Sequence, residues 1–155
     1  MKIMLLPTER LDELNEIYDM RRYEGFQDTR RHNLECCKEI CAVASDKGKF
    51  VGEISIMTDN PNIPAAVIPG KRVYIFGLRV LPAYQNQGIG TSLVRYAVSF
   101  CAQRGVFEFT IGVETKNKRA RRLYERLGFV NFLENCSNVQ FGEICRFDLL
   151  ILKLR

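Results

Sequence analysis

The seven residues from Gln85 to Thr91, Gln-Asn-Gln-Gly-Ile-Gly-Thr, have the composition of a loop that binds phosphate. The apolar run before them, Val73 to Leu81, predicts a buried strand, and Pro82 ends it because proline has no N–H for ladder pairing. After them, apolar residues recur at the spacing of one helix face: Ile89, Leu93, Tyr96, Ala97, Phe100 and Cys101. The first turn of a helix has unpaired N–H groups and a partial positive charge, and glycines there let an anion approach the backbone. The pattern therefore predicts a strand, a phosphate-binding loop and a helix.

The spacing of Gly88 and Gly90 excludes the two commonest loops of this kind. A Walker loop ends in Gly-Lys-Ser/Thr, whereas here Thr91 follows Gly90 with no lysine. A dinucleotide loop needs a third small residue three positions after the second glycine, and that position holds Leu93. What remains is Gln-x-x-Gly-x-Gly, preceded by Val-x-Pro-x-Tyr. This sequence resembles the pyrophosphate loop of the GNAT family of N-acetyltransferases.

A second motif strengthens the resemblance. Asn117-x-x-Ala120-x-x-Leu123-Tyr124-Glu125-x-x-Gly128-Phe129 is similar to the family's other signature, a helix that lies along the cofactor. It follows the loop with one predicted helix and one predicted strand between them. Together the two motifs cover residues 73 to 130, whereas the first seventy residues resemble the family only in layout.

The resemblance implies an acetyl-CoA-dependent N-acetyltransferase, an acyltransferase that moves the acetyl group to a primary amine by direct transfer in a ternary complex. The acceptor is a small molecule or a protein amine. The implied partners are acetyl-CoA or CoA and the acceptor, with no nucleic acid and no membrane, in a monomer or homodimer. Two alternatives stay open, a CoA-binding regulatory module without turnover and a nucleic-acid-binding domain.

The resemblance also implies roles for individual residues. The backbone N–H of Leu78 polarises the thioester carbonyl, Val80 pairs with the pantetheine arm, and Tyr124 protonates the departing thiolate. Gly77 suits a strand irregularity that frees those backbone groups. Further residues contact the cofactor, through the loop and through the second motif: Gln85, Gln87, Gly88, Ile89, Gly90, Thr91, Asn117 and Arg119.

The base that deprotonates the acceptor ammonium is not assigned by the resemblance. Some relatives carry a glutamate early in the central strand, and the corresponding residue here is Tyr74. Glu53 on the preceding strand and Glu114 at the end of the following one are alternatives.

Length and composition are those of one globular domain spanning residues 1–155, with the cofactor-binding core at about 73–130. No apolar run has the length of a membrane span, and the N-terminal apolar run is too short for a secretory signal, so we expect a cytoplasmic protein. The chain has six cysteines without a Cys-x-x-Cys pair and a single histidine, His32, which predicts packed thiols and no metal site.

The net charge of +5 is modest, but basic residues crowd one segment: Lys116, Lys118, Arg119, Arg121, Arg122 and Arg126. Such a cluster fits a nucleic-acid surface, a solvated helix face or a seat for the cofactor phosphates. Only Tyr124 is interleaved with these charges, which argues against stacking on single strands.

The pattern of apolar residues predicts an α/β fold with a mixed, mostly antiparallel twisted sheet of about six to seven strands and helices on both faces. Helices are predicted from Glu9 to Met20, broken within Arg21 to Lys38, from Gly88 onward, and from Asn117 to Leu127. A long loop is predicted from Thr58 to Lys71. Strands are predicted at Ile3–Leu6, Glu39–Ala44, Phe50–Met57, Val73–Leu81, Val106–Val113, Phe129–Leu133 and Ile144–Leu154, the last of them near a sheet edge.

Overall fold

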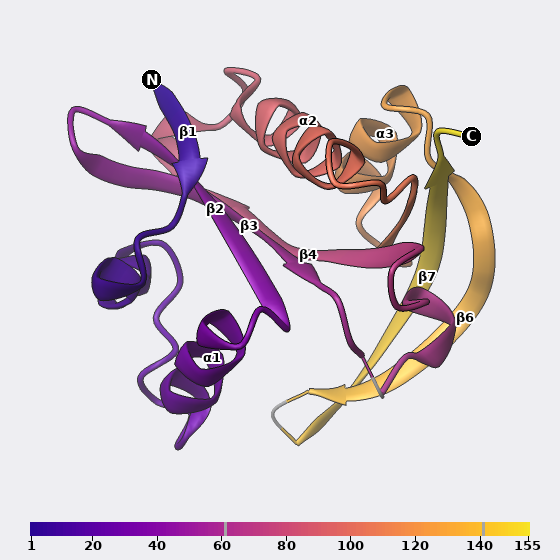
Figure 1. Ribbon diagram of the computed structural model, residues 1–155, viewed down its shortest axis with the longest axis horizontal. Coiled ribbons are helices and arrows are strands. Elements are labelled where there is room, and N and C mark those ends of the chain that lie inside the picture. Colours follow the sequence, from indigo (N-terminus) through magenta and orange to yellow (C-terminus); the bar gives the residue numbers. More distant parts are fainter. Residues whose placement is uncertain (61, 141) are drawn as a thin grey trace.

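A computed structural model describes residues 1–60, 62–140 and 142–155. One sheet runs through the molecule in the order β1-β2-β3-β4-β5-β7-β6 (Figure 1). Among the strand pairs of the described residues, β4 and β5 are parallel and the rest antiparallel, so the predicted mixed, mostly antiparallel sheet is confirmed. The strands are β1 Lys2–Leu5, β2 Glu39–Asp46, β3 Lys49–Met57, β4 Arg72–Val80, β5 Glu108–Glu114, β6 Val130–Gln140 and β7 Glu143–Lys153.

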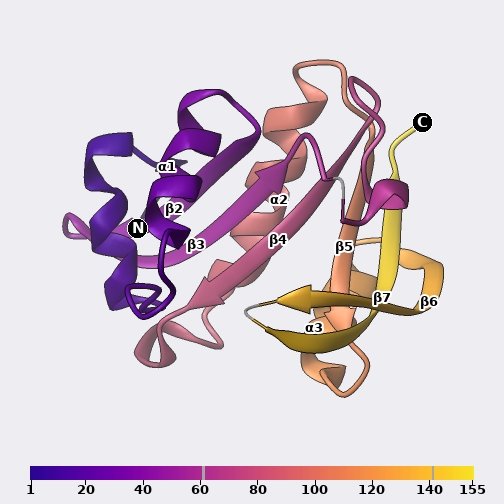
Figure 2. The ribbon, with the colours of Figure 1, turned by 90° about the horizontal axis from the view of Figure 1, so that it is seen from below.

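Helices cover both faces of the sheet, as predicted (Figures 1 and 2). The α-helices are α1 Phe26–Glu35, α2 Ile89–Ala102 and α3 Lys118–Arg126, and the 3₁₀ helices are η1 Thr8–Glu16, η2 Pro64–Ala66 and η3 Pro82–Tyr84. The helix predicted from Glu9 to Met20 is instead the 3₁₀ helix η1. Leu11 and Leu14 of η1 and Ile17, the residue after it, are three positions apart, which matches the three-residue turn of a 3₁₀ helix.

The main core lies between the sheet and the pair α2 and α3. Ile89, Leu93 and Ala97 of α2 are buried against strand residues such as Ile54 and Ile75. On the opposite face a smaller core joins η1 to β2 and β3. The six cysteines of the described residues are free thiols, and Cys41 and Cys101 are buried within these cores. None of the helices described in the structure is long and apolar enough to cross a membrane.

The predicted loop from Thr58 to Lys71 includes the short helix η2. Pro61, one of the prolines of this loop, lies outside the described residues. Residues around η2 form a third core with β7, in which Ile63, Ala66 and Val67 pack on Phe147 and Leu149. The residues around η2 therefore cover the sheet at β7.

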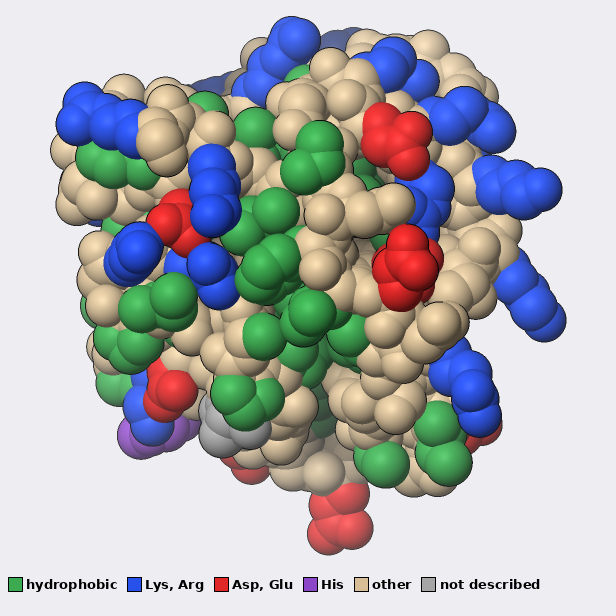
Figure 3. Space-filling view, turned by 90° about the vertical axis from the view of Figure 1, so that its right-hand side faces the viewer, with side chains coloured by type: hydrophobic (Ala, Val, Ile, Leu, Met, Phe, Trp, Pro, Cys, Tyr) green, Lys and Arg blue, Asp and Glu red, His purple; other side chains and the backbone are tan. Residues whose placement is uncertain are grey.

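The β6–β7 hairpin forms the far side of the sheet. The final strand β7 lies between β5 and β6, so it is one place inside the edge and β6 is the edge strand. Figure 3 looks at this side of the molecule, where apolar side chains gather across the middle of the face with lysines and arginines around them. Exposed apolar residues of the hairpin are Val130, Leu133, Val139 and Ile144.

The strands β4 and β5 pair only over their first halves and then diverge (Figure 2). Their register runs from Arg72 opposite Glu108 to Ile75 opposite Ile111 and stops there. Gly77 has a positive φ of 66°, and the pairing with β3 shifts register between Glu53 and Ser55. This irregularity is the one that the sequence predicted at Gly77, and the second half of β4 is left facing a gap.

Candidate acyl-donor site

The loop before α2 leaves a set of backbone N–H groups without partners from side chains. Asn86 and Gly88 have positive φ values of 63° and 80°, and α2 begins at the next residue, Ile89. Among the described residues, no side chain caps the helix at Gly88, so the N–H groups of the first turn are available to a ligand. A Cβ on Gly88 would meet nothing within 4 Å, so the loop is open on that side.

Hydrogen bonds fix this loop to β4 and to α3. The Gln85 side chain donates to the Val80 carbonyl at 3.0 Å. Arg119 donates to Asn86 Oδ1 at 2.6 Å and to Gln85 Oε1 at 3.4 Å, which ties α3 to the loop. The Gln87 side chain donates to the Ala83 carbonyl at 3.3 Å, so this amide is engaged within the protein. Asn117 accepts a hydrogen bond from Ala120 N–H at 3.1 Å and thereby caps α3.

A cavity of about 770 Å³ lies between β4, the loop, α2 and α3. This volume is within the range of small-molecule and cofactor sites. The cavity is lined by most of the residues predicted to contact the cofactor: Leu78, Val80, Gln85, Gly88, Ile89, Gly90, Thr91, Asn117, Arg119 and Tyr124. An uncapped helix start next to three arginines, Arg119, Arg122 and Arg126, suits the phosphates of CoA, so the residues fit this ligand.

The arginines of the basic cluster contact two different parts of the protein. Arg119, Arg122 and Arg126 line the cavity, whereas Arg121 points elsewhere. Arg121 forms an ion pair with Asp148 and donates to Asn131 Oδ1 at 2.9 Å, which joins α3 to β7 and β6. Helical spacing of the sequence could have separated these sets, because residues 119, 122 and 126 recur on one helix face. Sequence reasoning also missed lining residues outside the predicted set: Tyr84, Asn86, Ala120 and Leu123.

Tyr124 and Tyr74 bring two phenols close together at the gap between β4 and β5. Tyr124, from α3, is 6% exposed and lines the cavity. Burial, together with the nearby Tyr74, raises the pKa of Tyr124 to about 12. Burial also raises the pKa of Tyr74 to about 12. A Cβ on Gly112 of β5 would lie 2.8 Å from the Tyr74 hydroxyl, so this phenol occupies the space that a larger residue would need.

The backbone of Leu78 and Val80 is directed into the same gap. Leu81 N–H donates to the Val51 carbonyl of β3 at 2.8 Å, so Leu81 faces β3. In an antiparallel ladder successive residues direct their N–H groups to opposite sides, which turns Val80 and Leu78 away from β3. The bond from Gln85 to the Val80 carbonyl agrees with this direction.

The two carboxylates considered as bases lie in contrasting surroundings. Glu53 is 1% exposed and accepts a hydrogen bond from Arg30 at 3.0 Å, with Arg79 3.8 Å away. Burial raises the pKa of Glu53, and the two guanidinium groups oppose this effect. Glu114 is exposed at the end of β5, opposite Phe147.

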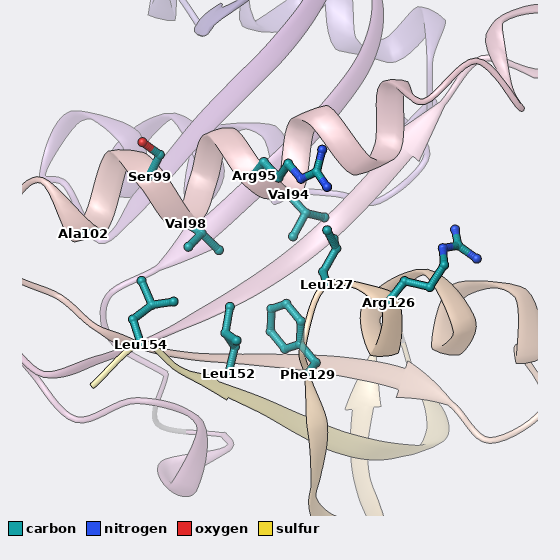
Figure 4. Close-up of a pocket in the computed structure, with 10 residues that line it drawn as sticks. All are labelled: Val94, Arg95, Val98, Ser99, Ala102, Arg126, Leu127, Phe129, Leu152 and Leu154. Atoms are coloured by element: carbon teal, nitrogen blue, oxygen red, sulfur yellow. The ribbon is translucent and has the colours of Figure 1, made fainter.

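A second hollow of about 330 Å³ lies on the other side of α3, between α2 and the end of β7. Figure 4 shows Val94 and Val98 directed from α2 toward Leu152 and Phe129. Its charged lining residues, Arg95 and Arg126, both carry guanidinium groups, and none of its lining side chains is an acid, a thiol or an imidazole. This hollow therefore offers no carboxylate, thiol or imidazole for acid–base chemistry.

Known proteins share both the sequence pattern and the fold. The model of the acetyltransferase (GNAT) family matches residues 9–129. The uncharacterized N-acetyltransferase YhfO of Bacillus subtilis is 29% identical over 125 residues, which cover 78% of each chain. N-alpha-acetyltransferase MAK3 of Arabidopsis thaliana is 34% identical over 119 residues, which cover 76% of this chain and 55% of that one, so the chain spans about half of this relative.

The fold is likewise that of solved acetyltransferase structures. The structure of yncA from Salmonella typhimurium with its cofactor acetyl-CoA has a TM-score of 0.75 at 20% identity, over 100% of this chain and 94% of that chain. The match of the family model extends over well more than half of the sequence and includes both motifs. The chain therefore belongs to the GNAT family of acetyltransferases, whose acetyl donor is acetyl-CoA.

Proposed function

We propose that the chain acts as a single N-acetyltransferase domain, which transfers the acetyl group of acetyl-CoA directly to a primary amine in a ternary complex. The observation that carries the proposal is the gap between β4 and β5, where the lining of the donor cavity, the backbone of Leu78 and the phenol of Tyr124 meet. An amine that enters the gap from the opposite face of the sheet reaches the thioester without crossing the donor cavity.

In this proposal the donor is held at both ends. The N–H groups from Gln87 to Thr91 bind the pyrophosphate, and Arg119, Arg122 and Arg126 neutralise phosphate charge. The pantetheine arm then follows the open edge of β4 and pairs with Val80. Because acetyl-CoA is held at its pyrophosphate and along its pantetheine arm, the thioester lies at a defined depth in the gap, which lowers the entropy cost of the reaction.

During transfer the amine nitrogen bonds to the thioester carbon and the carbon–sulfur bond breaks. The Leu78 N–H donates to the carbonyl oxygen as negative charge develops on it. The Tyr124 hydroxyl donates to the sulfur as it becomes a thiolate. Because the pKa of Tyr124 is raised to about 12, above that of an ordinary thiol, the phenol stabilises the thiolate by a hydrogen bond more readily than by complete proton transfer.

The acceptor ammonium must lose one proton before the attack. The raised pKa of Tyr74 keeps this phenol protonated at neutral pH, so it suits orientation of a water molecule or of the amine rather than proton removal. Glu53 is engaged by Arg30, and Glu114 is exposed at the strand end. We therefore propose that water accepts the proton at the gap, with Tyr74 as its hydrogen-bond partner.

The decisive experiment measures CoA release with a panel of primary amines and detects the acetylated product by mass spectrometry. Product formation above the hydrolysis of acetyl-CoA supports the enzyme. A protein that binds acetyl-CoA tightly but acetylates no amine, including N-terminal amines of peptides, would be a regulatory module instead. The free thiols agree with a reducing compartment, and we propose the cytoplasm as the place of action.

A further inference from the structure

The acceptor side of β4 carries an arginine directly beside the reaction site. Leu78 and Val80 line the donor cavity, and successive side chains of a strand point to opposite faces, so Arg79 points to the other face. The contacts agree, because the Arg79 guanidinium carbon lies 4.0 Å from the centre of the Tyr18 ring, next to η1. A Cβ on Gly77 would lie 3.6 Å from Arg79 Nη1, so the guanidinium rests against the bulge of β4.

The donors of Arg79 are not used by the protein. The side chain of Arg79 is 34% exposed, and its nearest carboxylate oxygen, Glu53 Oε1, is 3.8 Å away, beyond hydrogen-bonding distance. That oxygen already accepts a hydrogen bond from Arg30 at 3.0 Å. Within the described part of the chain, Arg79 donates no side-chain hydrogen bond, although a guanidinium has five N–H donors.

A second arginine lies at the same place. The guanidinium carbon of Arg22 is 4.9 Å from the centre of the Tyr23 ring, and interaction with the hydroxyls of Tyr23 and Tyr18 raises the pKa of Arg22. No carboxylate of the described residues lies within ion-pair distance of Arg22, whereas its neighbour Arg21 is paired with Asp19 at 2.8 Å. Tyr18 thus holds Arg79 against its ring and Arg22 at its hydroxyl.

The local charge is positive. Arg30 and Arg79 balance the two buried carboxylates, Glu39 and Glu53, and Arg22 is the charge that remains. A planar guanidinium binds a carboxylate through two parallel hydrogen bonds, which a neutral amide cannot match.

We propose that Arg79, assisted by Arg22, selects acceptors in which a carboxylate lies a few bonds from the amine that is acetylated. This inference rests on the proposed function and narrows its acceptor class. The short separation follows from the position of Arg79, which is adjacent in the chain to the Leu78 N–H and folds back against Gly77. A free amino acid and a peptide with an acidic side chain after its N-terminus both carry this chemistry.

The test compares kcat/KM within matched pairs of acceptors. One pair is an amino acid and its carboxamide, and the other is a short peptide with glutamate or glutamine in the second position. We expect the carboxylate member of one pair to be preferred roughly ten- to a hundred-fold, mainly through KM, because a charged hydrogen-bonded contact is lost in the neutral member. The pair that shows the preference identifies the source of the carboxylate.

Variants separate selection from structure. Arg79→Met keeps the apolar contact with Tyr18 but removes the guanidinium, and should therefore reduce the preference for the carboxylate member to about two-fold or less. Arg79→Lys keeps the charge beside Glu53 and therefore the fold. It should reduce the preference several-fold, because lysine lacks the two parallel N–H donors of the guanidinium. The control Arg21→Met removes a neighbouring arginine that is already paired, and should leave the preference intact.

The outcomes distinguish the two proposals. Equal use of charged and neutral acceptors, or a preference that survives both Arg79 variants, would overturn the role of Arg79 while leaving the acetyltransferase standing. Absence of acetylation of every amine, in a protein that binds acetyl-CoA, would overturn the proposed function and this inference with it.

Discussion

Replacement of Tyr124 by phenylalanine tests the chemistry of the gap most directly. The ring of Tyr124 is buried in the main core and packs near Phe129, with 6.1 Å between ring centres. No described residue forms a hydrogen bond with its hydroxyl, and this hydroxyl is not one of the fully buried polar atoms that lack a partner. Tyr124→Phe therefore keeps the packing and removes a donor that faces the cavity, so we expect stability and acetyl-CoA affinity close to those of the native protein.

The size of the effect follows from the raised pKa. A hydrogen bond to a charged group contributes about 1.5–3 kcal/mol, which corresponds to roughly ten- to a hundred-fold in rate. General acid catalysis can reach higher values, but a phenol with a pKa of about 12 transfers its proton to an ordinary thiolate only uphill. We therefore expect single-turnover acetyl transfer to slow by roughly ten- to a hundred-fold, without a fall in the native rate from phenol ionisation below about pH 10.

The assay is rapid-quench measurement of acetylated product with enzyme in excess, which isolates the chemical step from product release. Tyr84→Phe is the matched control, because Tyr84 lines the same cavity but its hydroxyl donates to Asp46 at 3.0 Å. The control should keep the native single-turnover rate. A native rate in Tyr124→Phe would show that the reasoning is wrong and that water alone stabilises the departing thiolate.

Four other predictions follow from the same structure. Gly90→Val should abolish acetyl-CoA binding in calorimetry while the fold survives, because a Cβ there makes only ordinary contacts of 3.5 Å and 3.8 Å within the protein; native affinity would contradict the anion site. CoA should bind more tightly than its analogue without the 3′-phosphate, and the difference should shrink with added salt, whereas equal affinities would leave the basic cluster a solvated face. In denaturant titrations, Arg30→Met should lower the free energy of unfolding by about 3–5 kcal/mol, because two buried carboxylates lose their cation. The exposed control Arg31→Met should lower it by less than about 1 kcal/mol. Similar losses in both variants would refute this reasoning. Burial raises the pKa of Cys41 to about 12 and of Cys101 to about 11, so as pH rises the unfolded chain loses these thiol protons first. The free energy of unfolding should therefore stay constant below pH 9 and fall by about 1.4 kcal/mol per pH unit per thiol toward pH 11. A flat profile in denaturant titrations would show that the thiols ionise alike in both states.

The sequence predicted the fold well, and most of the residues that it predicted for the donor line one cavity, because both depend on local patterns. Gly88, Gly90 and the apolar face of α2 lie within one continuous stretch, and their conformations are set by neighbours in the chain. The arrangement across the sheet could not be predicted in the same way. That Tyr74 lies next to Tyr124, or that Arg30 engages Glu53, depends on contacts between residues 23 to 50 positions apart, which no periodicity encodes.

The residues that we propose for the acceptor side could not be predicted from the motifs in the same way. Tyr18 and Arg22 follow η1, in the first seventy residues, which contain neither of the two motifs. Arg79 is inside the strand predicted to hold the donor, but its significance depends on which face it occupies. Strand alternation, applied to Leu78 and Val80, would have placed it opposite the donor without a structure.

In these proposals one strand contacts both substrates, and the bulge at Gly77 is what makes this possible. Past the bulge, β4 keeps its pairing with β3 through Arg79 and Val80 but has no pairing with β5, so its backbone N–H groups are left for the donor. The same departure from regular pairing leaves the Arg79 side chain beside the gap on the acceptor face. A substitution that regularised β4 would therefore affect donor and acceptor together. A change at Arg79 alone should affect only the acceptor, and this difference separates the two sides of the site experimentally.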